Sequence, residues 1–125
     1  MAEPTHAERV AAAVPDDCKL VALLHDAIED GHLPPYAFQQ LRAIDGGALT
    51  LITRWPRETY GEYIRHIAEA ATSENRDMRA AGRIALLVKI ADLRDNLNRP
   101  EGPPPGDLKK RYEKALDQLE RQGER

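Results

Sequence analysis

The densest group of chemically active side chains lies in residues 23–31, which read Leu-Leu-His-Asp-Ala-Ile-Glu-Asp-Gly. One imidazole and three carboxylates therefore follow directly on an apolar run. His25 and Asp26 offer the nitrogen and oxygen donors that bind divalent metal ions in proteins. Glu29 and Asp30 follow one helical turn later, where carboxylates can position or deprotonate water. This stretch predicts a metal site with an acid–base pair beside it.

The same stretch has a second interpretation. On a helical wheel, His25, Asp26, Glu29 and Asp30 all fall outside the apolar arc, as they would on a solvated helix face. However, no lysine separates the three carboxylates, so they repel one another. Glu29 and Asp30 also lie near the expected carboxyl end of the helix, where negative charge is unfavourable. A bound cation would relieve this repulsion, and the residue pattern alone favours the two interpretations equally.

A second acidic stretch, residues 88–96, reads Val-Lys-Ile-Ala-Asp-Leu-Arg-Asp-Asn. Its Asp92 continues an inward-facing helical stripe that is formed by Met78, Ala81, Ala85 and Val88. A carboxylate on such a stripe is costly unless it is paired or bound to a metal. We therefore expect Asp92 to share the metal site of His25, the alternative being a buried ion pair with Lys89 or an arginine.

His6 is the expected further ligand of this site. A metal held by His25, Asp26 and Asp92 needs another donor, and His6 begins the helix that precedes the His25 helix. The other two histidines lack such a context, so we expect His32 in a loop and His66 exposed on a helix.

Hydrophobic periodicity predicts helix after helix and no alternating strand pattern. The expected helices cover 6–14, 17–30, a short segment after Pro34-Pro35 that carries Tyr36, Phe38 and Leu41, then 48–54, a segment from Thr59 to Ala71, 76–98 and 107–122. Gly46-Gly47 is expected to separate the third and fourth. We expect an all-α fold of about six or seven helices, with helices 17–30 and 76–98 packed together at the core.

Length and composition bound the class of protein. The 125 residues, 42% hydrophobic and 31% charged, predict one domain over 1–125. A net charge of −3 gives no electrostatic reason to expect nucleic acid or an anionic membrane as partner. The single cysteine, Cys18, rules out a disulfide within the chain and indicates a reducing compartment. With no apolar run of membrane-spanning length and no signal peptide, a cytoplasmic location is expected.

Motifs of other enzyme classes are missing: the sequence has no glycine-rich phosphate loop, nucleophile elbow, His-Glu-x-x-His element or paired-cysteine motif. Instead, the sequence resembles the HD superfamily at four places: His6, residues 23–30, residues 88–92 and Asn96. The resemblance is strongest to the alarmone hydrolases, which comprise the hydrolase domain of RelA/SpoT enzymes and their small stand-alone relatives. It extends from His6 to the last helix and implies a compact helical bundle of the HD-domain type, with a metal ion between the helices.

The resemblance also implies a role for each matching residue. The metal, usually manganese (Mn²⁺), would be bound by His6, His25, Asp26 and Asp92. The catalytic pair that activates and orients water would be Glu29 and Asp30. Two residues would contact the substrate: Asn96 near the nucleotide, and Tyr112 near the ribose or phosphates. Where the family usually carries a histidine just before this asparagine, the chain has Asp95.

The implied reaction removes the 3′-pyrophosphate of (p)ppGpp and yields GDP or GTP plus pyrophosphate. The expected partner is thus a small phosphorylated nucleotide, and a homo-oligomer is compatible with the sequence. Arg54, Arg57 and Tyr60 are further candidates for phosphate contacts, although a solvated loop explains them equally well. Two alternatives remain: an HD phosphohydrolase with another phosphate-ester substrate, and a non-catalytic HD module that binds a nucleotide or protein.

Overall fold

The computed structural model describes residues 3–29 and 41–123, except for the side chains of Asp26, Ile28 and Glu29. This part of the chain contains six α-helices, one short 3₁₀-helix (η1) and no strand, which confirms the predicted all-α fold. Asp30, His32 and the short helix expected after Pro34-Pro35 lie outside the described residues. No described helix combines the length and the apolar character that crossing a membrane requires.

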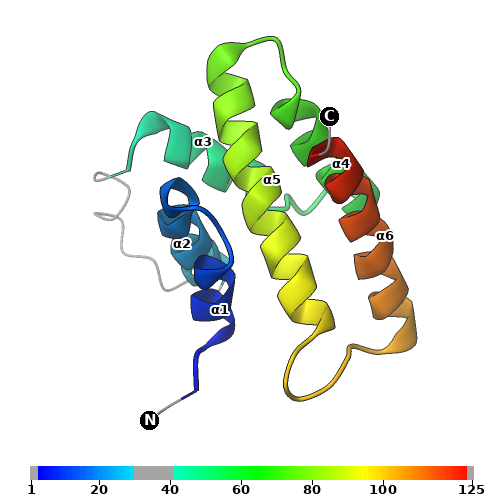
Figure 1. The fold of residues 1–125 in the computed structure, drawn as a ribbon. Helices are drawn as coiled ribbons and strands as arrows, with labels where there is room; N and C mark the ends of the chain where they lie inside the picture. Colours follow the sequence, from blue (N-terminus) through cyan, green and yellow to red (C-terminus); the bar gives the residue numbers. More distant parts are fainter. Residues whose placement is uncertain (1–2, 30–40, 124–125) are drawn as a thin grey trace.

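The helices follow one another along the described parts of the chain. Their bounds are α1 His6–Ala12, η1 Asp16–Cys18, α2 Lys19–Glu29, α3 Ala43–Ile52, α4 Tyr60–Ala71, α5 Arg76–Leu97 and α6 Gly106–Gly123. The long helix α5 occupies the middle of the molecule, with α1, α2 and α3 on one side and α4 and α6 on the other (Figure 1). Helix α2 contacts α5 as expected, but α3 and α4 contact it more extensively. The core therefore forms around α5.

Capping boxes fix where two of the helices begin. The Thr5 hydroxyl accepts a hydrogen bond from the Glu8 backbone, and the Glu8 carboxylate accepts one from the Thr5 backbone. Thr59 forms the same motif at the start of α4. Such reciprocal bonds satisfy backbone donors that have no partner within the helix. They set His6 and Tyr60 as the first residues of α1 and α4.

Helix α3 begins earlier than the sequence suggested. The prediction placed Gly46-Gly47 between two helices, but both glycines lie inside α3, which begins at Ala43 and ends at Ile52. Arg42 forms two 2.8 Å hydrogen bonds with the buried Asp45 carboxylate and so anchors the first turn. A Cβ atom on Gly47 would lie 3.1 Å from Ala81 Cβ, so close packing on α5 explains a glycine at this position.

The inward stripe of α5 is confirmed from Ala81 to Asp92 but not at Met78. Ala81, Ala85, Val88 and Asp92 are all buried, whereas Met78 is 45% exposed. Met78 lies in the first turn of α5, at an open groove beside α3, so the buried stripe begins one turn later than predicted.

Gly82 allows α4 and α5 to approach closely. A Cβ atom at this position would lie 2.7 Å from the Ala70 carbonyl oxygen and would also overlap the Ala71 nitrogen. Because these are backbone atoms, the helices themselves would have to separate. We expect Gly82→Ala to lower the free energy of unfolding by about 1–3 kcal/mol, measured by urea denaturation.

Gly46→Ala is the matched control, since Gly46 is also helical but a Cβ atom added there would have nothing within 4 Å. We expect that variant to gain about 0.5–1 kcal/mol from helix propensity alone. A Gly82→Ala protein as stable as wild type would contradict the close approach of α4 and α5.

Candidate metal and phosphate site

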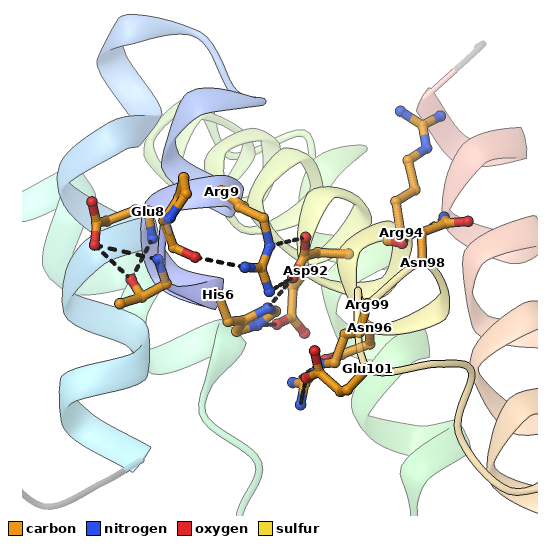
Figure 2. A network of polar contacts seen from close by, with 12 residues as sticks. His6, Glu8, Arg9, Asp92, Arg94, Asn96, Asn98, Arg99 and Glu101 are labelled. Atoms are coloured by element: carbon orange, nitrogen blue, oxygen red, sulfur yellow. Dashed lines mark hydrogen bonds and ion pairs between the residues drawn. The ribbon is translucent and has the colours of Figure 1, made fainter. Parts of the chain in front are cut away.

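His6 joins the first helix to two carboxylates of α5. Its Nε2 atom lies 2.7 Å from Asp92 Oδ1, and its Nδ1 atom lies 2.5 Å from Asp95 Oδ2. The pairs are 86 and 89 residues apart in the sequence, so only the tertiary fold brings them together. Figure 2 shows His6 and Arg9 reaching from α1 towards Asp92 on α5. His6 and Asp92, two of the four predicted metal ligands, are therefore direct neighbours.

Arg9 and Asp95 form a second connection between the same helices. Arg9 Nε lies 2.8 Å from Asp95 Oδ1, and Arg9 Nη2 lies 3.1 Å from Asp95 Oδ2. Burial alone would raise the pKa of Asp95, but hydrogen bonds from Arg9 and His6 outweigh it and hold the pKa below its usual value. Arg9 therefore helps to keep Asp95 ionised and in place against the His6 ring.

Asp92 is buried together with a lysine. Lys89 Nζ lies 2.9 Å from Asp92 Oδ2, and the two residues are 7% and 4% exposed. Burial would raise the pKa of Asp92, but the His6 hydrogen bond and the charges of Lys89 and His25 lower it far below its usual value. Burial also opposes the charge on Lys89, yet the nearby Asp92 carboxylate raises the Lys89 pKa overall. The ion pair between Asp92 and Lys89, which the sequence offered as the alternative to a metal site, is therefore present in the structure.

His25 adds a third helix to this region. Its imidazole is 4% exposed on α2, which excludes the solvated-face interpretation for this residue. Its charge is one of the influences that lower the pKa of Asp92, so the two side chains lie in the same region. The side chains of Asp26 and Glu29 lie outside the described part of the structure, as does all of Asp30. The predicted ligands that the structure does describe come from α1, α2 and α5.

A cavity of about 280 Å³ opens beside Asp92. It is lined by His6, Arg54, Tyr60, Tyr63, Lys89, Asp92, Asn96, Arg99 and Tyr112. The two predicted substrate contacts, Asn96 and Tyr112, are both among these residues, whereas Arg57 is exposed and is not. Two arginines and a lysine outnumber the one carboxylate, although the whole chain carries a net charge of −3.

The donors can be compared with what a divalent ion requires. Two ligands with bonds of roughly 2.0–2.3 Å to one ion lie about 3 Å apart when they bind at right angles. The 2.7 Å between His6 Nε2 and Asp92 Oδ1 is close to that spacing. A metal-binding histidine also usually donates its other N–H to a carboxylate, the position that Asp95 occupies. The same 2.7 Å is also the length of a hydrogen bond, so the spacing of this pair allows a divalent ion without requiring one.

The described side chains do not by themselves complete such a site. Within the described residues, no group of three or more His, Cys, Asp or Glu side chains is arranged to hold a metal ion. His25 lies in the region but does not join His6 and Asp92 in a ready-made cluster. Of the remaining predicted ligands, Asp26 has no described side chain, so the fit rests on His6, Asp92 and the second carboxylate behind His6.

Sequence reasoning missed the residues that support His6. The sequence shows Asp95 where the HD superfamily that it resembles usually has a histidine, but that resemblance does not predict the contacts of Asp95 with His6 and Arg9. The spacing of the charged residues along the two helices could have indicated these contacts. His6 and Arg9 are three residues apart on α1, and Asp92 and Asp95 are three apart on α5, so each pair lies on one helix face. Opposite charges at matching spacing indicate that two helices pack with these faces together.

Comparison of the chain with protein-family models, with curated proteins and with solved structures returned no match.

Proposed function

We propose that this protein is a metal-dependent phosphohydrolase that acts on a phosphorylated nucleotide, with (p)ppGpp or a related compound as the leading substrate. In the proposed reaction, water attacks the phosphorus bonded to the 3′ oxygen, and the bond between them breaks. The 3′ oxygen leaves with a proton, and pyrophosphate is released. With (p)ppGpp the products are GDP or GTP and pyrophosphate.

The observation that carries this proposal is the position of the basic cavity directly beside the His6–Asp92 pair. Arg54, Lys89 and Arg99 supply positive charge from the loop before α4, from α5 and from the loop after α5. Arginine and lysine are the side chains that proteins use to bind phosphate groups. In a chain that is acidic overall, three such residues around one cavity favour a ligand with several negative charges.

The proposed metal ligands are His6, His25, Asp26 and Asp92, with manganese as the ion. A divalent ion bound there would polarise a phosphoryl oxygen and make water a better nucleophile at neutral pH. Asp95 holds the His6 ring through Nδ1, so Nε2 faces Asp92 Oδ1, and these two atoms would be the ligands from α1 and α5. Glu29 follows His25 by one turn of α2, and we propose that it accepts the proton of the attacking water, with Asp30 as its orienting partner.

Asn96 and Tyr112 are the proposed contacts to the nucleotide. Asn96 lies one turn beyond Asp92 on α5, and its Oδ1 atom accepts a 2.5 Å hydrogen bond from Arg99 Nη2. Tyr112 reaches the same cavity from α6. The cavity therefore offers amide, aromatic and guanidinium groups beside the metal ligands, a combination that suits a base or sugar joined to phosphates.

The test is a release assay on purified protein with a panel of nucleotides that includes (p)ppGpp, nucleoside triphosphates and simple phosphate esters. Pyrophosphate and phosphate are measured separately, with manganese and with excess EDTA. We expect manganese-dependent pyrophosphate release from a 3′-pyrophosphorylated nucleotide. Release of phosphate from another ester would indicate a phosphohydrolase of different substrate class. Absence of release from every compound would favour a non-catalytic binding module.

A further inference from the structure

Tyr60 has a buried hydroxyl group that lacks a hydrogen-bond partner in the described part of the chain. The residue is half-buried, begins α4 and lines the cavity beside Lys89 and Asp92. A buried hydroxyl without a partner costs about 1–3 kcal/mol, so such groups are uncommon and call for an explanation. A ligand oxygen in the cavity would provide the missing partner.

The ring of Tyr60 is held by neighbours on several sides. Its centroid lies 5.9 Å from that of Tyr63 and 6.3 Å from that of Tyr112. The Arg111 guanidinium lies 4.5 Å from the ring centroid, and that of Arg54 lies 5.7 Å away. These contacts fix the ring without using the hydroxyl. The position of the hydroxyl is thus set in advance by the aromatic and cationic side chains around it.

The hydroxyl is suited to donate a hydrogen bond to an anion. Burial raises the pKa of Tyr60, and this effect exceeds the opposing influence of Lys89, so the phenol keeps its proton at neutral pH. Arg54 donates hydrogen bonds of 3.2–3.3 Å to the Glu58 carbonyl and lies over the Tyr60 ring. Because its side chain is exposed, Arg54 is the member of this group that can move towards an entering anion.

We propose that Tyr60 is a substrate-binding residue whose hydroxyl donates a hydrogen bond to a phosphoryl oxygen of a diphosphate-bearing ligand in this cavity. The proposal rests on the proposed function, because it assigns the ligand's phosphates to the cavity beside Asp92. Lys89, whose charge is paired with Asp92, lines the same cavity, and Arg54 and Arg99 supply positive charge at exposed positions. The ligand class is a pyrophosphate group, either free or attached to a nucleotide.

The test measures binding of inorganic pyrophosphate to the whole protein in excess EDTA, by isothermal titration calorimetry. Omitting metal and turnover separates this inference from the proposed hydrolysis. We expect wild type to bind pyrophosphate and Tyr60→Phe to bind it about 10-fold or more weakly, as the loss of a hydrogen bond to a charged group predicts. We also expect the melting temperature of ligand-free Tyr60→Phe to equal or exceed that of wild type, because the substitution removes an unsatisfied group.

Tyr63→Phe is the matched control. The Tyr63 side chain lines the same cavity, but its hydroxyl already donates a 2.5 Å hydrogen bond to the Ile52 carbonyl at the end of α3, and phenylalanine keeps the ring that packs on Tyr60. We expect Tyr63→Phe to lower the melting temperature and to leave pyrophosphate affinity within about 2-fold of wild type. Equal affinity of wild type and Tyr60→Phe would overturn the proposal. So would a wild type that binds no pyrophosphate at millimolar concentration, whatever the release assay shows.

Discussion

Asp92→Ala is expected to reduce manganese-dependent pyrophosphate release by at least about 10³-fold. Asp92 is the proposed metal ligand on α5, and the charge stabilisation that a metal ion supplies amounts to several kcal/mol. The variant should also be less stable. It leaves Lys89, 7% exposed, without its counter-ion, and such an uncompensated buried charge typically costs about 3–5 kcal/mol. Release assays and urea denaturation measure the two effects.

The double variant Asp92→Ala/Lys89→Met distinguishes the loss of pyrophosphate release from the loss of stability. It removes both members of the buried pair and replaces the lysine with an apolar side chain of similar length. We expect it to recover most of the lost stability, because replacing a buried ion pair with apolar groups is often close to neutral. We expect no recovery of pyrophosphate release, since the metal ligand is still missing. Recovery of both would identify Asp92 as a structural partner of Lys89.

Glu29→Gln is expected to lower turnover by roughly 10²–10⁴-fold, the usual contribution of a positioned acid–base group. Glutamine keeps the shape of the side chain but cannot accept the proton of the attacking water. Because Glu29 is not a proposed ligand, the variant should retain manganese and nucleotide binding. The measurements are pyrophosphate release at saturating substrate and the metal content of the same sample.

Two outcomes would change the role assigned to Glu29. If Glu29→Gln lost manganese as completely as Asp92→Ala, Glu29 would be a metal ligand. If turnover stayed within about 2-fold of wild type, another residue would be the base, because loss of a positioned base has a much larger effect.

The fold was largely predictable because its signals are local. Apolar periodicity and the capping residue Thr59 placed α4 and α5 within a residue or two of their observed bounds. The prediction failed at Gly46-Gly47, where tertiary packing overrides a local preference for a turn. The glycine at position 47 is explained by Ala81, which lies more than thirty residues away in the sequence. Only the packing of α3 on α5 brings Ala81 so close that a Cβ atom on Gly47 would lie 3.1 Å from it.

The site was only partly predictable, because its residues come from distant parts of the chain. Burial of Asp92 followed from its place on the α5 stripe, and its meeting with His6 followed from the family resemblance. The support of His6 by Asp95 depends on how α1 packs against α5, which periodicity does not encode. The same holds for Tyr60. The sequence marked it only as one of three candidates for phosphate contact, and the lack of a partner for its buried hydroxyl is visible only in three dimensions.

The most direct test of the proposed metal site is a manganese titration of metal-free protein, in which electron paramagnetic resonance measures the ion that stays free. Wild type and Asp92→Ala/Lys89→Met are compared, both shown to be folded by circular dichroism. We expect wild type to bind a single manganese ion per chain and the folded double variant to bind none. Equal manganese binding by the two proteins would contradict the placement of a metal at His6 and Asp92.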